Sequence, residues 1–393
     1  MNGIESVRPQ LDRLQRRSLV AGALGLALCV GGAAFDPRQF FQSYLQAYLF
    51  WIGISLGGSA ILMLHHLVGG RWGFPIRRLL EAGTRTLPLM AVLFLPILMG
   101  LRDLYAWARP AEVAADELLQ HKSTYLNASA FTVRAVIYFA VWIGMTYFLN
   151  KWSLEQDRTA DRSLMERLRR LSGPGLVLYG LTATFSAIDW VMSLEPRWFS
   201  TIYGMVFMAG HGLEAVAFAI IGAALLARRG LLAEATSPGV FRDLGNLTLT
   251  FLMLWAYLAF SQFLIVWAEN LTDEIPWYLH RSAGGWGWVA FALFGFQFAM
   301  PFLLLLFREA KQSAAALAGV ALVIIAMRMV DLFWLVAPAF HPGEFRLHWM
   351  DVVAPIGLGG LWLSVFVWHL KGRPALPLHD PRMEEALGRA GGA

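Results

Sequence analysis

The chain has 393 residues, of which 57% are hydrophobic and only 15% are charged, and its mean hydropathy is +0.53. Soluble domains carry about 25% charged residues, so the excess of apolar side chains must face lipid. The net charge of +5 is no nucleic-acid signature, because the basic residues are scattered between apolar runs. Cys29 is the only cysteine, which excludes a disulfide framework, a C-x-x-C-H haem attachment and a cysteine-ligated iron–sulfur cluster.

Apolar runs long enough to cross a bilayer recur along the whole chain. A transmembrane helix needs about 20 predominantly apolar residues. The sequence predicts an all-α polytopic membrane protein with about ten spans, near 18–35, 42–68, 86–104, 128–150, 174–194, 198–227, 244–268, 286–307, 314–336 and 348–370. Residues 1–17 are expected to form a cytoplasmic segment without a cleavable signal, and 371–393 an extended cytoplasmic tail.

The basic residues set the expected orientation. With the N-terminus in the cytoplasm, 23 Lys and Arg lie on the inner side and seven on the outer side. The positive-inside rule therefore places both termini in the cytoplasm. Segment 153–172 is expected to be an amphipathic cytoplasmic helix, and 109–127 an outer surface helix.

The spans suggest a weak internal repeat. Spans two and six run in the same direction, are rich in glycine and carry histidine. We therefore expect one transmembrane domain, 18–370, with two side-by-side four-helix bundles, 42–195 and 198–336, flanked by spans 18–35 and 348–370.

His211 and Glu214 lie near the centre of the sixth predicted span. Residues three apart share one face of a helix. Ionisable side chains inside spans are costly and usually mark function. A His–Glu pair can pass a proton, because histidine titrates near neutrality and burial raises a carboxyl pKa towards it. The alternatives are a satisfied interhelical hydrogen bond, or a metal site completed by other helices.

A second group of ionisable residues is expected in the outer half of the membrane. It comprises Arg134, Asp189, Glu269, Arg328, Asp331 and Asp351. Because an unpaired buried charge is prohibitive, the cheapest arrangement pairs Arg328 with Asp331 and Arg134 with Asp189. These pairs are either structural or form the outward half of a proton path.

Two adjacent histidines, His65 and His66, lie near the cytoplasmic end of the second span. Neighbouring helix residues point about 100° apart, so both cannot face one site. Either could receive protons from the cytoplasm, and snorkelling without a further role is the alternative. A membrane haem needs two facing histidines, and only His211 is deep in a span.

Several long strings resemble one known family. The run AIDWVMSLEPRWFSTIYGMVFMAG (187–210) resembles the hairpin between spans five and six of the NrfD-like membrane subunits of alternative complex III. The strings FFQSYLQAYLFWIGISLGGSAILMLHHLVGGRWG (40–73), FSQFLIVWAENLTDEIPWYLHRSAGGWGW (260–288) and FRLHWMDVVAPIGLGGLW (345–362) are similar to the smaller of that complex's two such subunits, its F subunit. The resemblance runs from about residue 15 to 372.

The resemblance implies a subunit of a bacterial inner-membrane quinol:electron-acceptor oxidoreductase. It implies two four-helix bundles and no cofactor or metal in this chain. The implied partners are the C-type NrfD-like subunit, which is assigned the quinol pocket, an iron–sulfur subunit and c-type cytochrome subunits, with a terminal oxidase as a further partner. Asp189 matches the carboxylate of the D-W-x-M-S-L motif. The polar residues near it, Arg134, His211, Glu214, Arg328, Asp331 and Asp351, would be candidates for a proton half-channel.

Two other functions stay open at this point. The outer-half carboxylates with Trp190, Trp198 and Trp277 would form the quinol site itself if Asp189 accepted the hydroxyl proton and another chain accepted the electrons. A free-standing secondary transporter would favour matched pairs of broken helices. Pro88, Pro96 and Pro301 kink spans, but no matched pair appears.

Overall fold

The computed structural model describes residues 4–159, 161–232, 235–377, 379–380 and 382–383. Within these ranges the chain is almost entirely helical and contains no β-strand. Ten helices or helix runs in this part are long and apolar enough to cross a membrane: 5–33, 37–68, 71–99, 128–159, 163–194, 203–227, 238–269, 286–306, 314–339 and 349–371. The predicted all-α polytopic fold is confirmed.

The ten spans consist of continuous helices and of runs of shorter ones. The long helices are α1 (Ile4–Ala33), α2 (Pro37–Val68), α9 (Ala128–Thr159), α10 (Ser163–Trp190), α11 (Tyr203–Ala227), α12 (Pro238–Glu269), α17 (Ala314–Val336) and α18 (Trp349–Lys371). The shorter α-helices are α3 (Phe74–Thr84), α4 (Leu87–Val92), α5 (Leu95–Met99), α6 (Leu101–Leu104), α7 (Pro110–Ala115), α8 (Glu117–Lys122), α13 (Ile275–His280), α14 (Trp286–Ala292), α15 (Met300–Leu306) and α16 (Arg308–Gln312). The remaining elements are η1 (Arg71–Gly73), η2 (Ala106–Ala108), η3 (Met192–Leu194), η4 (Leu293–Ala299) and η5 (Ala337–Ala339), of which η4 is a π-helix and the others are 3₁₀-helices.

Local signals in the sequence fix several helix ends. The Asp36 carboxylate accepts a hydrogen bond from the backbone N–H of Gln39 at the start of α2, and the Ser237 hydroxyl does the same for Val240 in α12. Both helices have proline at the first position, where no backbone donor is needed. Helix α12 is capped at its C-terminal end by Asn270, which has φ of 48° and tolerates this left-handed conformation better than most residues.

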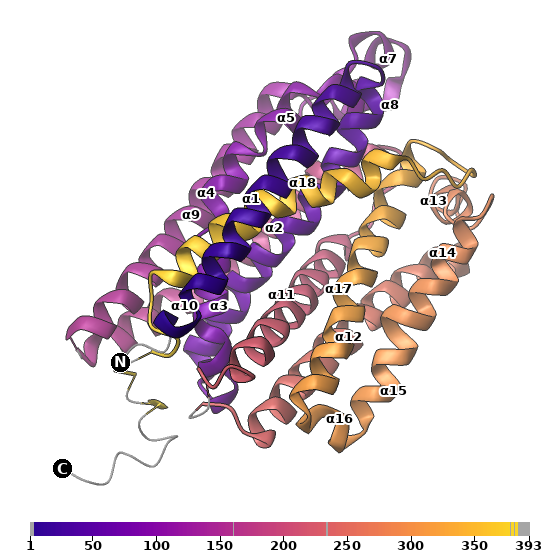
Figure 1. Ribbon diagram of the computed structural model, residues 1–393. Coiled ribbons are helices and arrows are strands. Elements are labelled where there is room, and N and C mark those ends of the chain that lie inside the picture. The colour runs from indigo at the N-terminus through magenta and orange to yellow at the C-terminus, as the bar shows by residue number, and fades with distance from the viewer. Residues whose placement is uncertain (1–3, 160, 233–234, 378, 381, 384–393) are drawn as a thin grey trace, which may run out of the picture.

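Helix α11 is the central element of the molecule. It contacts α2, α3 and α10 on one side and α12 and α17 on the other. The N-terminal helix α1 packs along α18, which also contacts α2, so the first and last spans lie together in Figure 1. We refer to the end with both termini as the terminal end, and to the opposite one as the α7–α13 end. The division into two four-helix bundles stays a prediction.

Three connecting segments differ from their predictions. In segment 153–172, residues 153–159 continue α9 and residues 163–172 begin α10, so these parts do not form a separate amphipathic helix. Residues 109–127 contain two short helices, α7 and α8, instead of one. Helix α1 begins at Ile4, so the segment expected before the first span continues it as helix. Helices α1, α9 and α10 therefore extend beyond the apolar runs that the sequence shows.

Candidate functional site

Close packing of α2 against α11 places the central ionisable residues. A Cβ atom at Gly57 would lie 1.9 Å from the carbonyl oxygen of His211, and one at Gly53 would lie 1.8 Å from Oε1 of Glu214. A Cβ atom at Gly210 of α11 would lie 2.3 Å from Nη2 of Arg328. Glycine at these positions therefore makes room both for the helix backbone and for the charged side chains.

The central cluster comprises His211 and Glu214 of α11 and Arg328 and Asp331 of α17. All four are buried, and the Glu214 side chain is completely so. Arg328 forms an ion pair with Asp331, as the sequence predicts, and its Nε lies 3.8 Å from Oε2 of Glu214. His211 and Glu214 both lie against Gly53 without a hydrogen bond to each other. The His211 Nδ1 lies 3.3 Å from the Tyr179 hydroxyl of α10.

The central cluster contains buried polar atoms that protein side chains do not satisfy. Among the described residues, both carboxylate oxygens of Glu214 and Nε of Arg328 have no hydrogen-bond partner. The Gln297 amide and the Trp255 indole N–H face the Asp331 carboxylate and interact with it. More than 90% of buried polar groups in proteins are hydrogen-bonded, and water often supplies the bond. The unsatisfied atoms of Glu214 and Arg328 are therefore sites where water could bind.

The predicted pair of Arg134 and Asp189 is present and fully satisfied. Arg134 donates two hydrogen bonds to the Asp189 carboxylate, at 2.8 and 2.9 Å, and Tyr138 donates a third at 2.7 Å. The Arg134 guanidinium also stacks on the Tyr125 ring at 3.8 Å. Burial and the nearby Asp189 carboxylate raise the pKa of Tyr125 to about 12. No member of the central cluster is among the partners of Asp189.

The other outer-half acids lie apart from both groups. Asp351 accepts hydrogen bonds from Ser43 at 2.5 Å and Gln39 at 3.1 Å, and from the backbone of His348, so it joins α2 to the start of α18. Glu269 ends α12 with an exposed side chain. The outer-half residues therefore do not share one site, because α9–α10, α11–α17 and α2–α18 each bury their own polar group.

The tryptophans proposed for a quinol site are also divided. Trp190 is packed among aromatic rings of the first half, including Phe94 and Trp142. Trp198 and Trp277 are stacked with ring centroids 4.4 Å apart. Asp189 is thus near Trp190 in sequence and in space, while the other two rings belong to another part of the molecule.

His65 and His66 are both buried and, as predicted, do not share one site. The His65 ring packs against Trp72 and Phe74, and its Nε2 lies 3.2 Å from the carbonyl oxygen of Gly70. Both ring nitrogens of His66 lack a partner among the described residues. Arg382 donates from Nη1 to the His66 carbonyl at 3.4 Å, so the C-terminal segment reaches this end of α2.

A terminal-end charge network near these histidines was not predicted. Glu81 of α3 accepts hydrogen bonds from Arg77, Arg78, Arg373 and Ser153, at 2.5 to 3.0 Å. The network continues through Arg78 to Asp157 of α9 and through Arg77 to Asp380. Burial raises the pKa of Asp380, but Arg77 and Arg382 together hold that pKa below its ordinary value. Arg77 and Arg78 lie between the second and third predicted spans, where the sequence predicts a cytoplasmic loop. The pattern R-R-x-x-E, which they form with Glu81, nevertheless has helical spacing.

Hydroxyl and amide groups extend from this network towards mid-membrane. Asn150 accepts from Arg373 through its backbone carbonyl, at 3.3 Å, and donates to the Thr84 hydroxyl at 2.9 Å. The Thr86 and Ser55 hydroxyls lie 2.7 Å apart. Ser55 follows Gly53 by two residues on α2, so the polar groups approach the level of the central cluster without a direct hydrogen bond to it.

A large apolar cavity lies beside the central cluster, and we call it the lateral cavity. It has a volume of about 780 Å³ and is lined by α12, α13, α14, η4 and α17, with Asp331 in its wall. Gln297 and Trp255 were missed as site residues by the sequence reasoning. A lone amide in the apolar run of the eighth span is the signal that could have identified Gln297.

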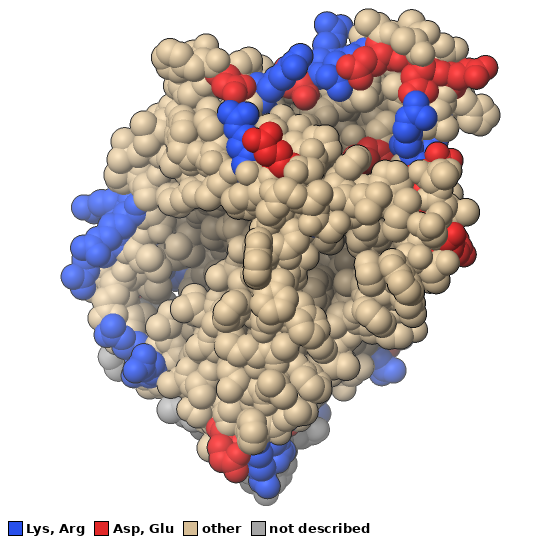
Figure 2. All heavy atoms as spheres, turned by 90° about the vertical axis from the view of Figure 1, so that its right-hand side faces the viewer, with Lys and Arg blue, Asp and Glu red and all other residues tan. Residues whose placement is uncertain are grey.

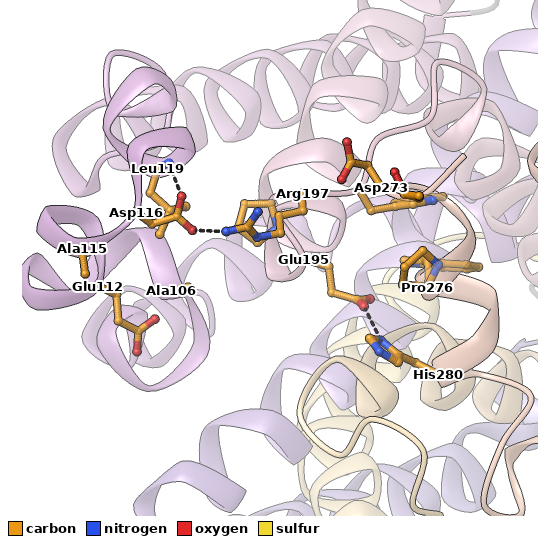
Figure 3. Close-up of a pocket in the computed structure, with 14 residues that line it drawn as sticks. Ala106, Glu112, Ala115, Asp116, Leu119, Glu195, Arg197, Asp273, Pro276 and His280 are labelled. Atoms are coloured by element: carbon orange, nitrogen blue, oxygen red, sulfur yellow. Dashed lines mark hydrogen bonds and ion pairs between the residues drawn. The ribbon is translucent and has the colours of Figure 1, made fainter. Parts of the chain in front are cut away.

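A second, more polar cleft lies at the α7–α13 end and is shown in Figure 3. It has a volume of about 470 Å³ and lies between α7–α8 and α13. Arg197 donates to Asp116 at 2.7 Å across it, and Glu195 lies 3.5 Å from Nδ1 of His280. Glu195 also accepts from the buried Arg281 at 2.6 Å. These ion pairs join the connecting segments of the two halves of the chain.

Within the described part of the chain, no three His, Cys, Asp or Glu side chains are grouped closely enough to hold a metal ion. The chain matches no protein-family model and no curated protein. The contacts and burial of the described residues are therefore the basis for the chemistry of the site.

Proposed function

We propose that this chain is a membrane subunit of a respiratory quinol-oxidising complex and carries a proton half-path at its centre. The observation that supports this proposal is Glu214, whose fully buried carboxylate has no hydrogen-bond partner within the described part of the chain and lies 3.8 Å from Arg328. Buried ionisable groups with unfilled hydrogen bonds can bind water. Such groups are suited to proton transfer, because a proton that they bind can be passed to a neighbouring water or side chain. Fully satisfied pairs such as Arg134–Asp189 suit a structural role.

The proposed route runs from the lateral cavity to mid-membrane. It begins at Asp331, passes Arg328 and Glu214, and ends at His211 and Tyr179. Under the positive-inside rule the α7–α13 end faces outwards and both termini face the cytoplasm. The terminal-end network and the Ser55–Thr86 hydroxyls then lie on the cytoplasmic side of the route.

The respiratory assignment rests on the resemblance to the F subunit of alternative complex III. It places the chain in a bacterial inner membrane beside a C-type NrfD-like subunit, an iron–sulfur subunit and c-type cytochrome subunits. Those partners would carry the iron–sulfur clusters and haems, and quinol would be oxidised nearby. Affinity purification of the tagged chain in mild detergent tests this. We expect haem absorbance and quinol oxidation in the eluate, and a lone chain or homodimer would contradict the assignment.

Glu214→Gln tests the proton route within the assembled complex. The amide keeps the shape of the side chain but cannot carry a proton at neutral pH. We expect quinol oxidation to be retained and proton uptake in proteoliposomes to fall at least tenfold. The matched control is Glu269→Gln, an exposed residue, which should leave both unchanged. Unchanged proton uptake in Glu214→Gln would remove the route.

A further inference from the structure

We propose that the lateral cavity binds an uncharged, membrane-soluble molecule with a hydrogen-bonding head group on a long apolar chain, the head group lying against Trp255 and Asp331. The site is a property of this chain and does not depend on the respiratory partners. It shares only Asp331 with the proposed proton route.

The walls of the lateral cavity show how a ligand would enter. Aromatic residues of α12 and η4 that line it, Tyr257, Phe260 and Phe294, are each more than 60% exposed at the molecular surface. Figure 2 views the α13–α15 side, where the middle of the face is almost free of charged side chains and is hollowed. Since this band is the part of the molecule that faces lipid, molecules dissolved in the bilayer reach the cavity laterally.

The inner end of the lateral cavity is polar. Trp255 lines it and is 8% exposed, and its indole N–H faces the Asp331 carboxylate. Asp331 lines it as well, and the amide of Gln297, which lies in the π-helix η4, faces the same carboxylate. Single π-helical turns inside α-helices are frequent at functional sites. A head group at this end would meet an indole N–H donor and a carboxylate acceptor side by side.

The charges at the lateral cavity select an uncharged head group. The Asp331 carboxylate is already neutralised by Arg328. Arg281, the cation in the wall, donates to Glu195 and to the backbone carbonyls of Trp277 and Leu335. No wall charge is therefore left to neutralise a phosphate or carboxylate, and an ionic head group would be buried without compensation. Alcohols, phenols and ring carbonyls carry no such penalty.

Photolabelling of the purified full-length chain in lipid nanodiscs tests the site. The probes are an azido-substituted quinone with a short prenyl chain, a diacylglycerol with a photoreactive chain, and a phosphatidylglycerol with that same chain. We expect at least one uncharged probe to label the cavity segments of α12 or η4, as mapped by mass spectrometry. The labelled probe identifies the source of the ligand. Equal labelling by phosphatidylglycerol, or no labelling by either uncharged probe, would overturn the proposal.

Two variants test whether the label reports the lateral cavity. Ala256→Phe fills the cavity, and we expect it to weaken labelling at least tenfold. Ala140→Phe is the matched control, because Ala140 is exposed on the lipid-facing side of α9. Trp255→Phe keeps the cavity shape but removes the N–H donor, and should weaken labelling about threefold to tenfold. Thermal unfolding of each variant confirms that it folds. Wild-type labelling in both Ala256→Phe and Trp255→Phe would contradict the site.

Discussion

Carboxylates buried inside the spans differ in how many hydrogen bonds they accept. Asp189 accepts three from side chains, whereas Glu214 accepts none among the described residues. A low dielectric makes a satisfied polar group rigid and an unsatisfied one costly. A buried carboxylate without hydrogen bonds destabilises the fold, so a purely structural residue would not be expected to keep one. For this reason the functional proposal is centred on Glu214.

Asp189→Asn should destabilise the protein without a direct effect on the proton route. The change leaves Arg134 with no counter-ion in a partly buried position. Breaking a buried pair costs about 3 to 5 kcal/mol, and we expect about 3 because Arg134 is 18% exposed. The free energy of SDS-induced unfolding measures the loss.

Tyr138→Phe is the matched control for Asp189→Asn. It removes one hydrogen bond to the same carboxylate and should cost about 1 kcal/mol. If Asp189→Asn were as stable as the wild type but lost quinol oxidation, Asp189 would belong to the functional site and the structural interpretation would be wrong.

Helix α2 shows at the scale of an element why small residues matter in this fold. Gly53 and Gly57 of α2 both contact α11, but the atoms of α11 that they contact differ in how easily they can move. Gly53 faces the end of the Glu214 side chain, whereas Gly57 faces the backbone carbonyl of His211. A side chain can shift by rotation, but a helix backbone moves only with the whole helix.

Gly57→Ala should therefore destabilise the protein. We expect a loss of about 1 to 3 kcal/mol in SDS-induced unfolding, because the new methyl group forces α2 and α11 apart. Gly144→Ala in α9 is the matched control, since a Cβ atom there has no neighbour within 4 Å. Alanine at that position should be neutral or slightly stabilising. Equal effects of the two changes would contradict the close approach of α2 and α11.

At the scale of the whole molecule, the C-terminal segment packs against α3 at the terminal end. Arg373 reaches Glu81 of α3, and Asp380 reaches Arg77 at 2.6 Å. Both side chains are buried, so residues separated by about 300 positions in sequence form one network. This contact depends on the complete fold and cannot form in isolated helices.

The Asp380 pair predicts a dependence of stability on pH. Because the pKa of Asp380 in the folded protein lies below its ordinary value of 3.8, the pair stabilises the fold fully above that value. The contribution is lost as the pH falls through the lower, folded pKa. Thermal unfolding midpoints measured from pH 6 down to pH 3 should therefore fall more steeply for the wild type than for Asp380→Asn. Identical slopes would show that Asp380 does not bind Arg77 in solution.

The sequence by itself determined the ten spans and the residues that pair locally. Hydrophobic runs reveal spans because lipid requires continuous apolar helices, and Arg328–Asp331 was predictable because residues three apart share a helix face. Arg134–Asp189 followed from charge balance alone. Helix ends outside lipid could not be predicted as well as the spans, because helix propensity and packing rather than hydropathy decide where they fall. Segment 153–172 shows this, since α9 and α10 extend into it.

Only the tertiary structure decided which polar residues share a site. Depth in the membrane is readable from sequence, but the direction in which each helix face points depends on packing against its neighbours. The six outer-half residues therefore separate into four places, while Gln297 and Trp255 join Asp331 beside the lateral cavity. The terminal-end network escaped prediction for the same reason: its arginines resemble loop charges until α3, α9 and the C-terminal segment are brought together around Glu81.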